Sequence, residues 1–262
     1  MESSFCEPYM NKLQFSATEW SFFKTGFPPE DFYRRLVQIG IGAVEMAPEE
    51  RWTAAKKAGL KLLNIAAPGM TNGLNRVENH DSLLPTIAEM ITDAGDNQIA
   101  QIVVFSGNRV GQSDCEGKEN CEAGLRELAP LAEKSGVTLI LEMLCTNDHP
   151  DYQADRSSFG FDVARAINSP AVKVLYDIYH MHWMEEDVMA DITENLDLIA
   201  HIHVAEKNKR SKPVAHGGID YSSIFKKIND AGYCGYWGLE FIPQGNPLEE
   251  LKEAVDLFRS FT

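Results

Sequence analysis

Four residues of types that bind metal ions occur in the second half of the chain, each within a short apolar run. The runs are LILEML, VLYDIYH, IAHIHVAE and YWGLEFIP, and the residues are Glu142, Asp177, His203 and Glu240. A carboxylate or an imidazole is costly to bury unless it is paired, hydrogen-bonded or bound to a metal ion. A single one would usually be a satisfied polar group of the core. Four of them in consecutive runs are hard to explain independently, so we predict one shared metal site.

The donor types of this predicted site indicate which ion it would bind. Three carboxylates that meet at one point repel one another strongly unless a cation lies between them. Three oxygen donors and one imidazole favour a single divalent ion, with Mn²⁺ or Mg²⁺ first and Co²⁺ or Zn²⁺ as alternatives. An ion chelated by the two oxygens of a hydroxy-carbonyl compound acidifies the adjacent C–H bond, and a carboxylate within reach can move that proton. These residue types are therefore compatible with the isomerisation of a small hydroxy-carbonyl compound.

The elements that must position these residues alternate along the chain. Eight apolar runs of strand length are rich in Val, Ile, Leu and aromatic residues, which is typical of buried parallel strands. Amphipathic stretches between several of them predict helices. Strict alternation predicts an α/β fold, a (β/α)8 TIM barrel with a closed parallel sheet and an outer layer of helices. The strands are predicted at 13–17, 43–46, 60–66, 99–105, 138–143, 172–177, 199–204 and 236–241, and helices at 83–94, 119–134, 161–167, 188–196, 222–231 and 248–258.

Prolines and the absence of linkers set the expected boundaries. Pro29, Pro85, Pro130 and Pro170 are predicted to mark helix starts or breaks. No low-complexity tract or composition shift divides the chain. We therefore predict an N-terminal extension at residues 1–11 and a single catalytic barrel domain at residues 12–262.

Charge and cysteine content limit the expected partners and location. The formal net charge is -15, and because nucleic-acid binding depends on clustered Lys and Arg, neither nucleic acid nor an anionic membrane is expected as a partner. A local pocket can differ in sign from the whole surface, so an anionic small-molecule substrate is compatible with this charge. Five scattered cysteines, no leader-like segment and no long apolar run favour a reduced, cytoplasmic protein. The sequence leaves the oligomeric state open.

The motifs of the second half resemble a known family. LEMLCTNDHPDY, KVLYDIYHMHWMEEDV, HIHVAEKNKR and YWGLEFIPQGNPLEEL are similar to the hydroxypyruvate isomerase-like branch of the xylose isomerase-like TIM-barrel superfamily, alongside ketose 3-epimerases. The resemblance implies a metal-dependent isomerase of carbohydrate metabolism that converts hydroxypyruvate to tartronate semialdehyde through an enediolate. A ketose 3-epimerase or an inosose-type isomerase on the same site is the alternative, and a non-catalytic metal-binding barrel is a further one.

The resemblance also implies roles for individual residues. The four residues of the predicted metal site would be the ligands, and Glu142 and Glu240 would also move the proton, from opposite faces of the enediolate. His180 and a basic residue after the seventh strand would hold substrate oxygens. The family arginine corresponds to Arg210, and an alignment shifted by one residue would choose Lys209.

Four further residues have more than one interpretation. Glu45, at the end of the second predicted strand, would either contact the substrate or form a salt bridge at the rim. His149 lies in a loop and is a candidate substrate contact. His201 would be either a hydrogen-bonding partner of a metal ligand or a core histidine. Trp20, after the first strand, would be either a pocket wall or a core aromatic residue.

Overall fold

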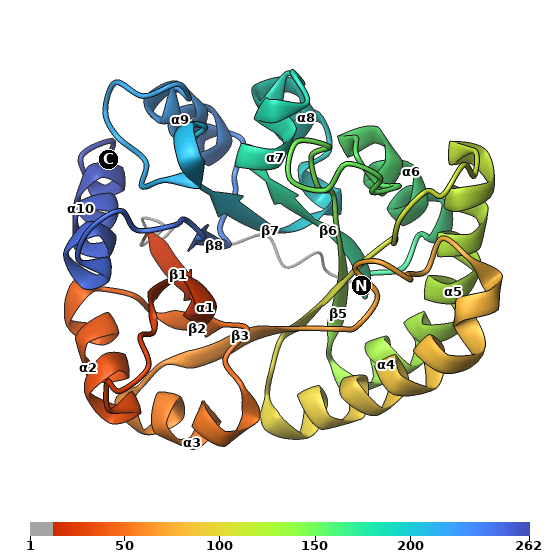
Figure 1. Cartoon of the computed structure of the whole chain (residues 1–262), viewed down its shortest axis with the longest axis horizontal. Coiled ribbons are helices and arrows are strands. Elements are labelled where there is room, and N and C mark those ends of the chain that lie inside the picture. The colour runs from red at the N-terminus through yellow and green to blue at the C-terminus, as the bar shows by residue number, and fades with distance from the viewer. Residues whose placement is uncertain (1–12) are drawn as a thin grey trace.

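The computed structural model describes residues 13–262, in which eight parallel strands form a closed barrel in sequence order (Figure 1). The TIM-barrel fold predicted from the alternating pattern is therefore confirmed. The extension predicted at residues 1–11 lies outside the described residues. The strands are β1 (Gln14–Thr18), β2 (Ala43–Glu45), β3 (Lys61–Ala66), β4 (Gln101–Val104), β5 (Thr138–Glu142), β6 (Val172–Asp177), β7 (Ile199–Val204) and β8 (Tyr236–Leu239).

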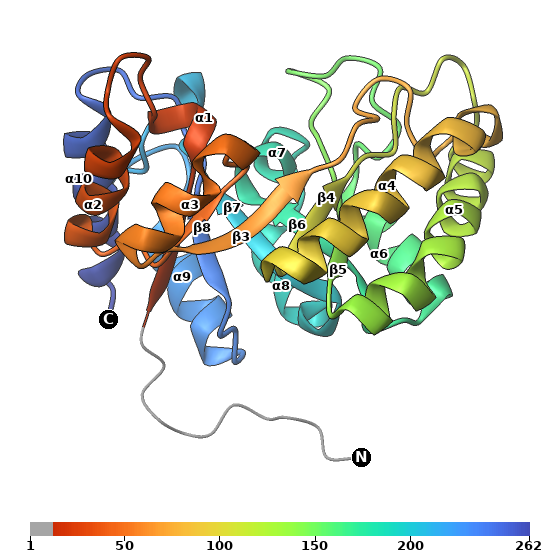
Figure 2. The same cartoon turned by 90° about the horizontal axis from the view of Figure 1, so that it is seen from below.

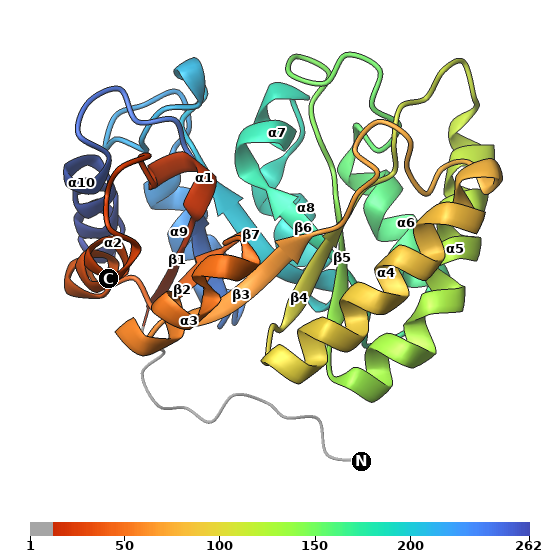
Figure 3. The same cartoon turned by 60° about the horizontal axis from the view of Figure 1, so that its bottom comes forward.

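Helices follow the strands and cover the outside of the barrel, as Figure 2 and Figure 3 show. Two short 3₁₀ helices, Leu196–Leu198 and Asn208–Arg210, flank β7. No helix among residues 13–262 is long and apolar enough to cross a membrane. The α-helices are α1 (Glu19–Phe22), α2 (Pro29–Ile39), α3 (Glu49–Ala58), α4 (Val77–Asn97), α5 (Asp114–Ser135), α6 (Ser157–Ile167), α7 (Ile178–Trp183), α8 (Val188–Glu194), α9 (Tyr221–Asp230) and α10 (Pro247–Arg259).

Two of the predicted proline breaks are wrong. Pro29 begins α2 as expected, but Pro85 lies inside α4 and Pro130 lies inside α5. A proline in a helix interior removes one backbone hydrogen bond and crowds the preceding turn. The two long helices pack against each other, and buried side chains such as Ile87 and Leu128 keep both on the barrel. Tertiary packing therefore outweighs the local cost of each proline.

The strand register brings the predicted ligand residues to one end of the barrel. Glu142 pairs with Leu175 across β5 and β6, and Asp177 pairs with His203 across β6 and β7. His203 in turn pairs with Gly238 across β7 and β8. The carboxyl-terminal ends of four neighbouring strands thus lie side by side, which is where TIM barrels carry their active sites.

Candidate active site

The four side chains predicted to bind a metal ion meet at the carboxyl-terminal end of the barrel. One ligand atom from each of Glu142, Asp177, His203 and Glu240 lies within 4.8 Å of the others, and all four residues are buried. They come from the ends of β5, β6 and β7 and from the residue that follows β8. Three oxygen donors and one imidazole at this spacing fit a divalent ion, because three buried carboxylates need positive charge beside them.

Contacts from neighbouring elements hold the carboxylates in place. Asp177 Oδ1 accepts a hydrogen bond from Tyr179 N (2.8 Å) and so caps α7. Glu240 Oε1 accepts a hydrogen bond from Trp20 Nε1 (3.1 Å). Each of these residues therefore has one oxygen bound by a neighbouring donor, while its second oxygen faces the cluster and contacts Arg210.

His203 presents one ring nitrogen to this cluster. Its Nδ1 lies 3.1 Å from Glu240 Oε2 and 3.8 Å from Glu142 Oε1, but without hydrogen-bond geometry to either oxygen. Its Nε2 lies 2.9 Å from Glu45 Oε2, on the other side of the ring. A buried nitrogen without a hydrogen-bond partner, next to two carboxylates, is the arrangement that a metal-ligating imidazole needs.

The charges of the cluster shift its proton affinities in opposite directions. Burial raises the pKa of Glu142, and the negative charge of Glu240 adds to the rise. Burial also acts on Glu240, but the charges of His203 and Arg210 outweigh it and lower the pKa of Glu240. The charges of Glu240 and Glu45 overcome the effect of burial on His203 and raise its pKa well above its ordinary value. Without a metal ion, the cluster therefore holds protons and a guanidinium as its counter-charge.

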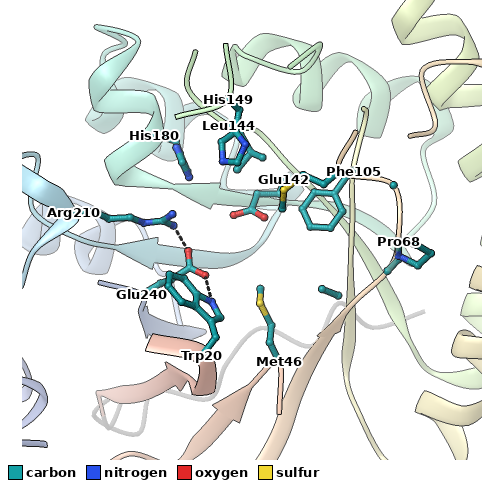
Figure 4. A pocket seen from close by; sticks show the side chains of 14 residues that line it. Trp20, Met46, Pro68, Phe105, Glu142, Leu144, His149, His180, Arg210 and Glu240 are labelled. Atoms are coloured by element: carbon teal, nitrogen blue, oxygen red, sulfur yellow. Dashed lines mark hydrogen bonds and ion pairs between the residues drawn. The ribbon is translucent and has the colours of Figure 1, made fainter. Parts of the chain in front are cut away.

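A cavity of about 400 Å³ adjoins the cluster (Figure 4). Glu142 and Glu240 line it together with Arg210, His180 and His149, three of the predicted substrate contacts. The remaining walls are mainly apolar and come from the ends of β1 to β5. They consist of Trp20, Met46, Ala66, Ala67, Pro68, Gly69, Met70, Phe105 and Leu144.

Arg210, and not Lys209, faces the cavity. Arg210 Nη2 lies 3.1 Å from Asp177 Oδ2 and also contacts Glu240 Oε2. Lys209 is exposed and lines a separate surface pocket. Both residues have a positive φ, 57° for Lys209 and 48° for Arg210, so the chain turns sharply here. The alternative alignment that placed Lys209 against the substrate is therefore corrected.

His180 lies fully buried beside the cavity with one nitrogen available. Its Nδ1 accepts a hydrogen bond from Cys145 N (3.2 Å), and its Nε2 has no hydrogen-bond partner. Burial and the charge of Arg210 lower the pKa of His180 well below its ordinary value. A neutral ring that accepts at Nδ1 carries its proton on Nε2, so His180 can donate to a substrate oxygen. His149 lies next to it, with ring centroids 5.9 Å apart.

Glu45 lies in neither of its two expected positions. Its side chain is fully buried, does not line the cavity and pairs with two histidines inside the barrel rather than with a partner at the rim. Its Oε2 instead accepts hydrogen bonds from His203 and from His201 inside the barrel. His201 is therefore linked to His203 through Glu45, and the charges of the two histidines hold the pKa of Glu45 well below its ordinary value although burial opposes this.

Comparison with known proteins places this geometry in a family. The model of the xylose isomerase-like TIM barrels matches residues 19–261. The chain belongs to this family. A human protein provisionally named a hydroxypyruvate isomerase is 26% identical, over 92% of this chain and 94% of the relative. The hydroxypyruvate isomerase of Escherichia coli is 30% identical over 46% of each chain, and the 2-oxo-tetronate isomerase of Cupriavidus necator is 30% identical over 44% of each.

Several solved structures share the fold at low identity. A family 2 AP endonuclease from Brucella melitensis has a TM-score of 0.82 at 21% identity and covers 92% of this chain and 97% of its own. A D-psicose 3-epimerase from Clostridium cellulolyticum has a TM-score of 0.79 at 16% identity, over 95% and 99%. The relatives matched by sequence include several proteins named isomerases and a protein named an epimerase. The expected enzyme class, an isomerase, is therefore confirmed.

The apolar cavity walls were mostly missed from the sequence. Trp20, expected as either a pocket wall or a core aromatic residue, lines the cavity and is 50% exposed. Met46, Phe105 and Leu144, which follow β2, β4 and β5, are cavity residues that the sequence patterns did not indicate. The signal that could have found them is position, since every residue directly after a barrel strand is a candidate for the active-site rim.

Proposed function

We propose that this chain is a divalent-metal-dependent isomerase that interconverts small hydroxy-carbonyl compounds through an enediolate. One observation carries the proposal: the buried cluster of three carboxylates and one imidazole adjoins a cavity that also presents Arg210 and His180. The cluster supplies the donors for one ion, Mn²⁺ or Mg²⁺ ahead of Co²⁺ or Zn²⁺. When bound, that ion acidifies the C–H bond beside the carbonyl and stabilises the enediolate charge.

Glu142 and Glu240 are the residues proposed to move the proton. They lie on β5 and directly after β8, so they approach the shared centre from different parts of the barrel. One carboxylate removes the proton from the hydroxyl-bearing carbon, and a carboxylate returns a proton to the former carbonyl carbon. The hydroxyl proton passes to the former carbonyl oxygen, which completes the isomerisation without a redox partner.

Arg210 and His180 are proposed to hold the substrate. The Arg210 guanidinium faces the cavity and offers charge-assisted hydrogen bonds to a substrate carboxylate or hydroxyl. The neutral His180 ring offers its Nε2 proton to a substrate oxygen. Both lie beside Asp177, with Arg210 Nη2 at 3.1 Å and His180 Nε2 at 3.6 Å from its Oδ2. The substrate would therefore be oriented from the β6 and β7 side of the cavity.

Hydroxypyruvate is the first candidate substrate, with tartronate semialdehyde as product. Relatives named hydroxypyruvate isomerases support this choice, since one of them is similar over nearly the whole chain. Arg210, the one arginine among the described residues that line the cavity, suits a small substrate with one carboxylate. We also propose a cytoplasmic location and no nucleic-acid or membrane partner, in line with the net charge of -15.

The size of the cavity favours a second candidate, a longer unphosphorylated ketose that would be epimerised or isomerised on the same residues. About 400 Å³ is roughly the liquid volume of thirteen water molecules at about 30 Å³ each. A three-carbon substrate would leave most of that space unfilled, whereas a six-carbon ketose would fill more of it. Among the described residues that line the cavity, Arg210 is the one lysine or arginine, so a substrate phosphate would have a single cationic partner.

Proton exchange with solvent tests both candidates together. The Mn²⁺-loaded protein is incubated in D₂O with hydroxypyruvate, with free ketohexoses, with a ketohexose phosphate and with inososes, and carbon-bound deuterium and products are followed by NMR. Deuterated tartronate semialdehyde supports the first candidate, and deuterated ketose epimers support the second. No exchange and no product with any of these compounds would contradict the proposed function.

A further inference from the structure

A network of buried polar side chains lies behind the candidate ligand His203. Glu45 Oε2 accepts three hydrogen bonds, from His203 Nε2 (2.9 Å), His201 Nε2 (3.0 Å) and Asn64 Nδ2 (2.6 Å). All four residues are at most 1% exposed. The residues come from β2, β3 and β7, so the network crosses the interior of the closed barrel from β2 and β3 to β7.

Two features of the barrel accommodate the buried carboxylate of this network. A buried carboxylate is unfavourable unless several donors surround it. Gly238 on β8 leaves the necessary space, because a Cβ there would lie 2.6 Å from His201 Nε2, 2.6 Å from His203 Cδ2 and 2.8 Å from Glu45 Oε1. The pairing of β2 with β3 also shifts between Val44 and Glu45. Such an irregularity re-aims a side chain, and here Glu45 points into the barrel.

We infer that Glu45 is a positioning residue that selects which nitrogen of His203 can bind a metal ion. The inference rests on the proposed metal site. Because Nε2 of His203 donates to Glu45, that nitrogen carries a proton and has no free lone pair. The lone pair of the metal-bound ring is then on Nδ1, the atom that faces Glu142 and Glu240 at 3.8 and 3.1 Å.

His201 keeps Glu45 in this position. It donates to the same carboxylate oxygen, and its ring stands edge-on to that of His203, with centroids 4.8 Å apart and planes at 85°. Asn64, on the neighbouring strand β3, donates the third hydrogen bond to Oε2 of Glu45. The three donors together fix the carboxylate, and the carboxylate fixes the ring of His203. A second ion at Glu45, His201 and His203 is the competing explanation, because these residues also lie close enough to share one.

Metal titration of a matched pair of variants separates these explanations. Glu45→Gln keeps the shape of the side chain but removes the charge and half of its acceptor capacity. Loss of a residue that orients a metal ligand typically weakens metal affinity about 10- to 100-fold, and we expect this rise in the Mn²⁺ dissociation constant by calorimetry. Glu19→Gln is the control, since Glu19 is also a buried carboxylate with polar partners but lies outside the network and the cavity. Its Mn²⁺ affinity should equal that of the unaltered protein.

The stoichiometry and the kinetics give further readouts. One Mn²⁺ per chain in the unaltered protein and in Glu45→Gln is expected, with turnover of the variant recovering at saturating Mn²⁺. Two ions per chain that fall to one in Glu45→Gln would overturn the inference in favour of a second metal site. Equal affinities in Glu45→Gln and the unaltered protein would overturn it while leaving the proposed function intact. No Mn²⁺ binding by the unaltered protein would overturn both.

A measurement on the unaltered protein covers the case in which Glu45→Gln does not fold. In ¹⁵N-histidine-labelled protein loaded with diamagnetic Zn²⁺, NMR should show His203 with its proton on Nε2 and the metal-induced shift on Nδ1. A metal-induced shift on Nε2 would overturn the inference directly.

Discussion

Replacing Arg210 with methionine should remove the proposed substrate anchor and leave the four proposed metal ligands in place. Methionine retains an unbranched apolar stem but carries no charge. The Arg210 side chain is 14% exposed, faces the cavity and contacts Asp177 Oδ2 at 3.1 Å, while Glu240 Oε2 lies against the same nitrogen. The change therefore acts at once on the substrate and on the charge balance of the cluster.

The expected size of the effect follows from the kind of contact that is lost. A hydrogen bond to a charged group contributes about 1.5–3 kcal/mol, and a factor of ten corresponds to about 1.36 kcal/mol. We therefore expect kcat/KM to fall roughly 10- to 150-fold, with Mn²⁺ affinity undiminished. In the metal-free protein, loss of the guanidinium leaves Asp177 and Glu240 without their shared counter-charge, so the melting temperature should fall and recover when Mn²⁺ is added.

Lys209→Met is the matched control for this experiment. Lys209 is adjacent in sequence, equally charged and exposed, and it lines a different pocket. Its replacement should change kcat/KM by less than about twofold, as expected of a surface substitution. The reasoning is refuted if Lys209→Met has the larger effect, or if Arg210→Met loses its Mn²⁺.

Three further outcomes are expected. Glu142→Asp and Glu240→Asp should each retain Mn²⁺ but lose at least about 10²-fold in turnover and in solvent deuterium exchange, because the shortened carboxylate no longer reaches the substrate carbon. Near-normal turnover of Glu240→Asp would show that Glu240 is only a ligand. Chelation with EDTA should abolish turnover and lower the melting temperature, and Mn²⁺ at a hundred times its dissociation constant should restore about 2.7 kcal/mol of stability; unchanged turnover after verified metal removal would exclude a metal-dependent reaction. Burial raises the pKa of Cys145 to about 11, so mass spectrometry should find this thiol unmodified by iodoacetamide at pH 8 in the native protein and modified after unfolding. Rapid modification of the native protein would show that the contact between Cys145 and His180 opens readily.

The barrel and the clustering of the four proposed ligand residues were predictable because both depend on local patterns. Each buried strand is a short apolar run, and β6 and β7 coincide with the predicted residues. An ionisable residue within such a run, at the end that TIM barrels use for their sites, needs a compensating partner. Four such residues on neighbouring strands therefore indicated a common site before any contact was known.

The role of Glu45 could not be predicted, because its partners are distant in sequence. His201 and His203 lie 156 and 158 residues away, and the space for their rings depends on Gly238 on a third strand. Nothing near Glu45 in the sequence distinguishes a carboxylate at the rim from one turned into the barrel. The shift in pairing next to Val44 makes that difference, and it is a property of the assembled sheet.

The choice between Lys209 and Arg210 depended on backbone geometry that the sequence does not reveal. The two adjacent basic residues are interchangeable in an alignment, but consecutive positive φ angles turn one outward and the other into the cavity. The apolar walls were missed for a related reason, since Met46, Phe105 and Leu144 look like core residues unless the strand ends are known. Pro85 and Pro130 show the opposite case, in which a strong local signal is overruled by helix packing.

Anomalous diffraction from crystals soaked in Mn²⁺ tests the central claim most directly. We predict one anomalous peak per chain, bonded to Glu142, Asp177, His203 and Glu240 at about 2.0–2.4 Å, with Nδ1 as the nitrogen donor and Arg210 displaced from Glu240. A peak at Cys145, Asp148 and His180, the other group at this end that could hold an ion, would contradict the account. So would a soaked crystal with no peak at the four residues.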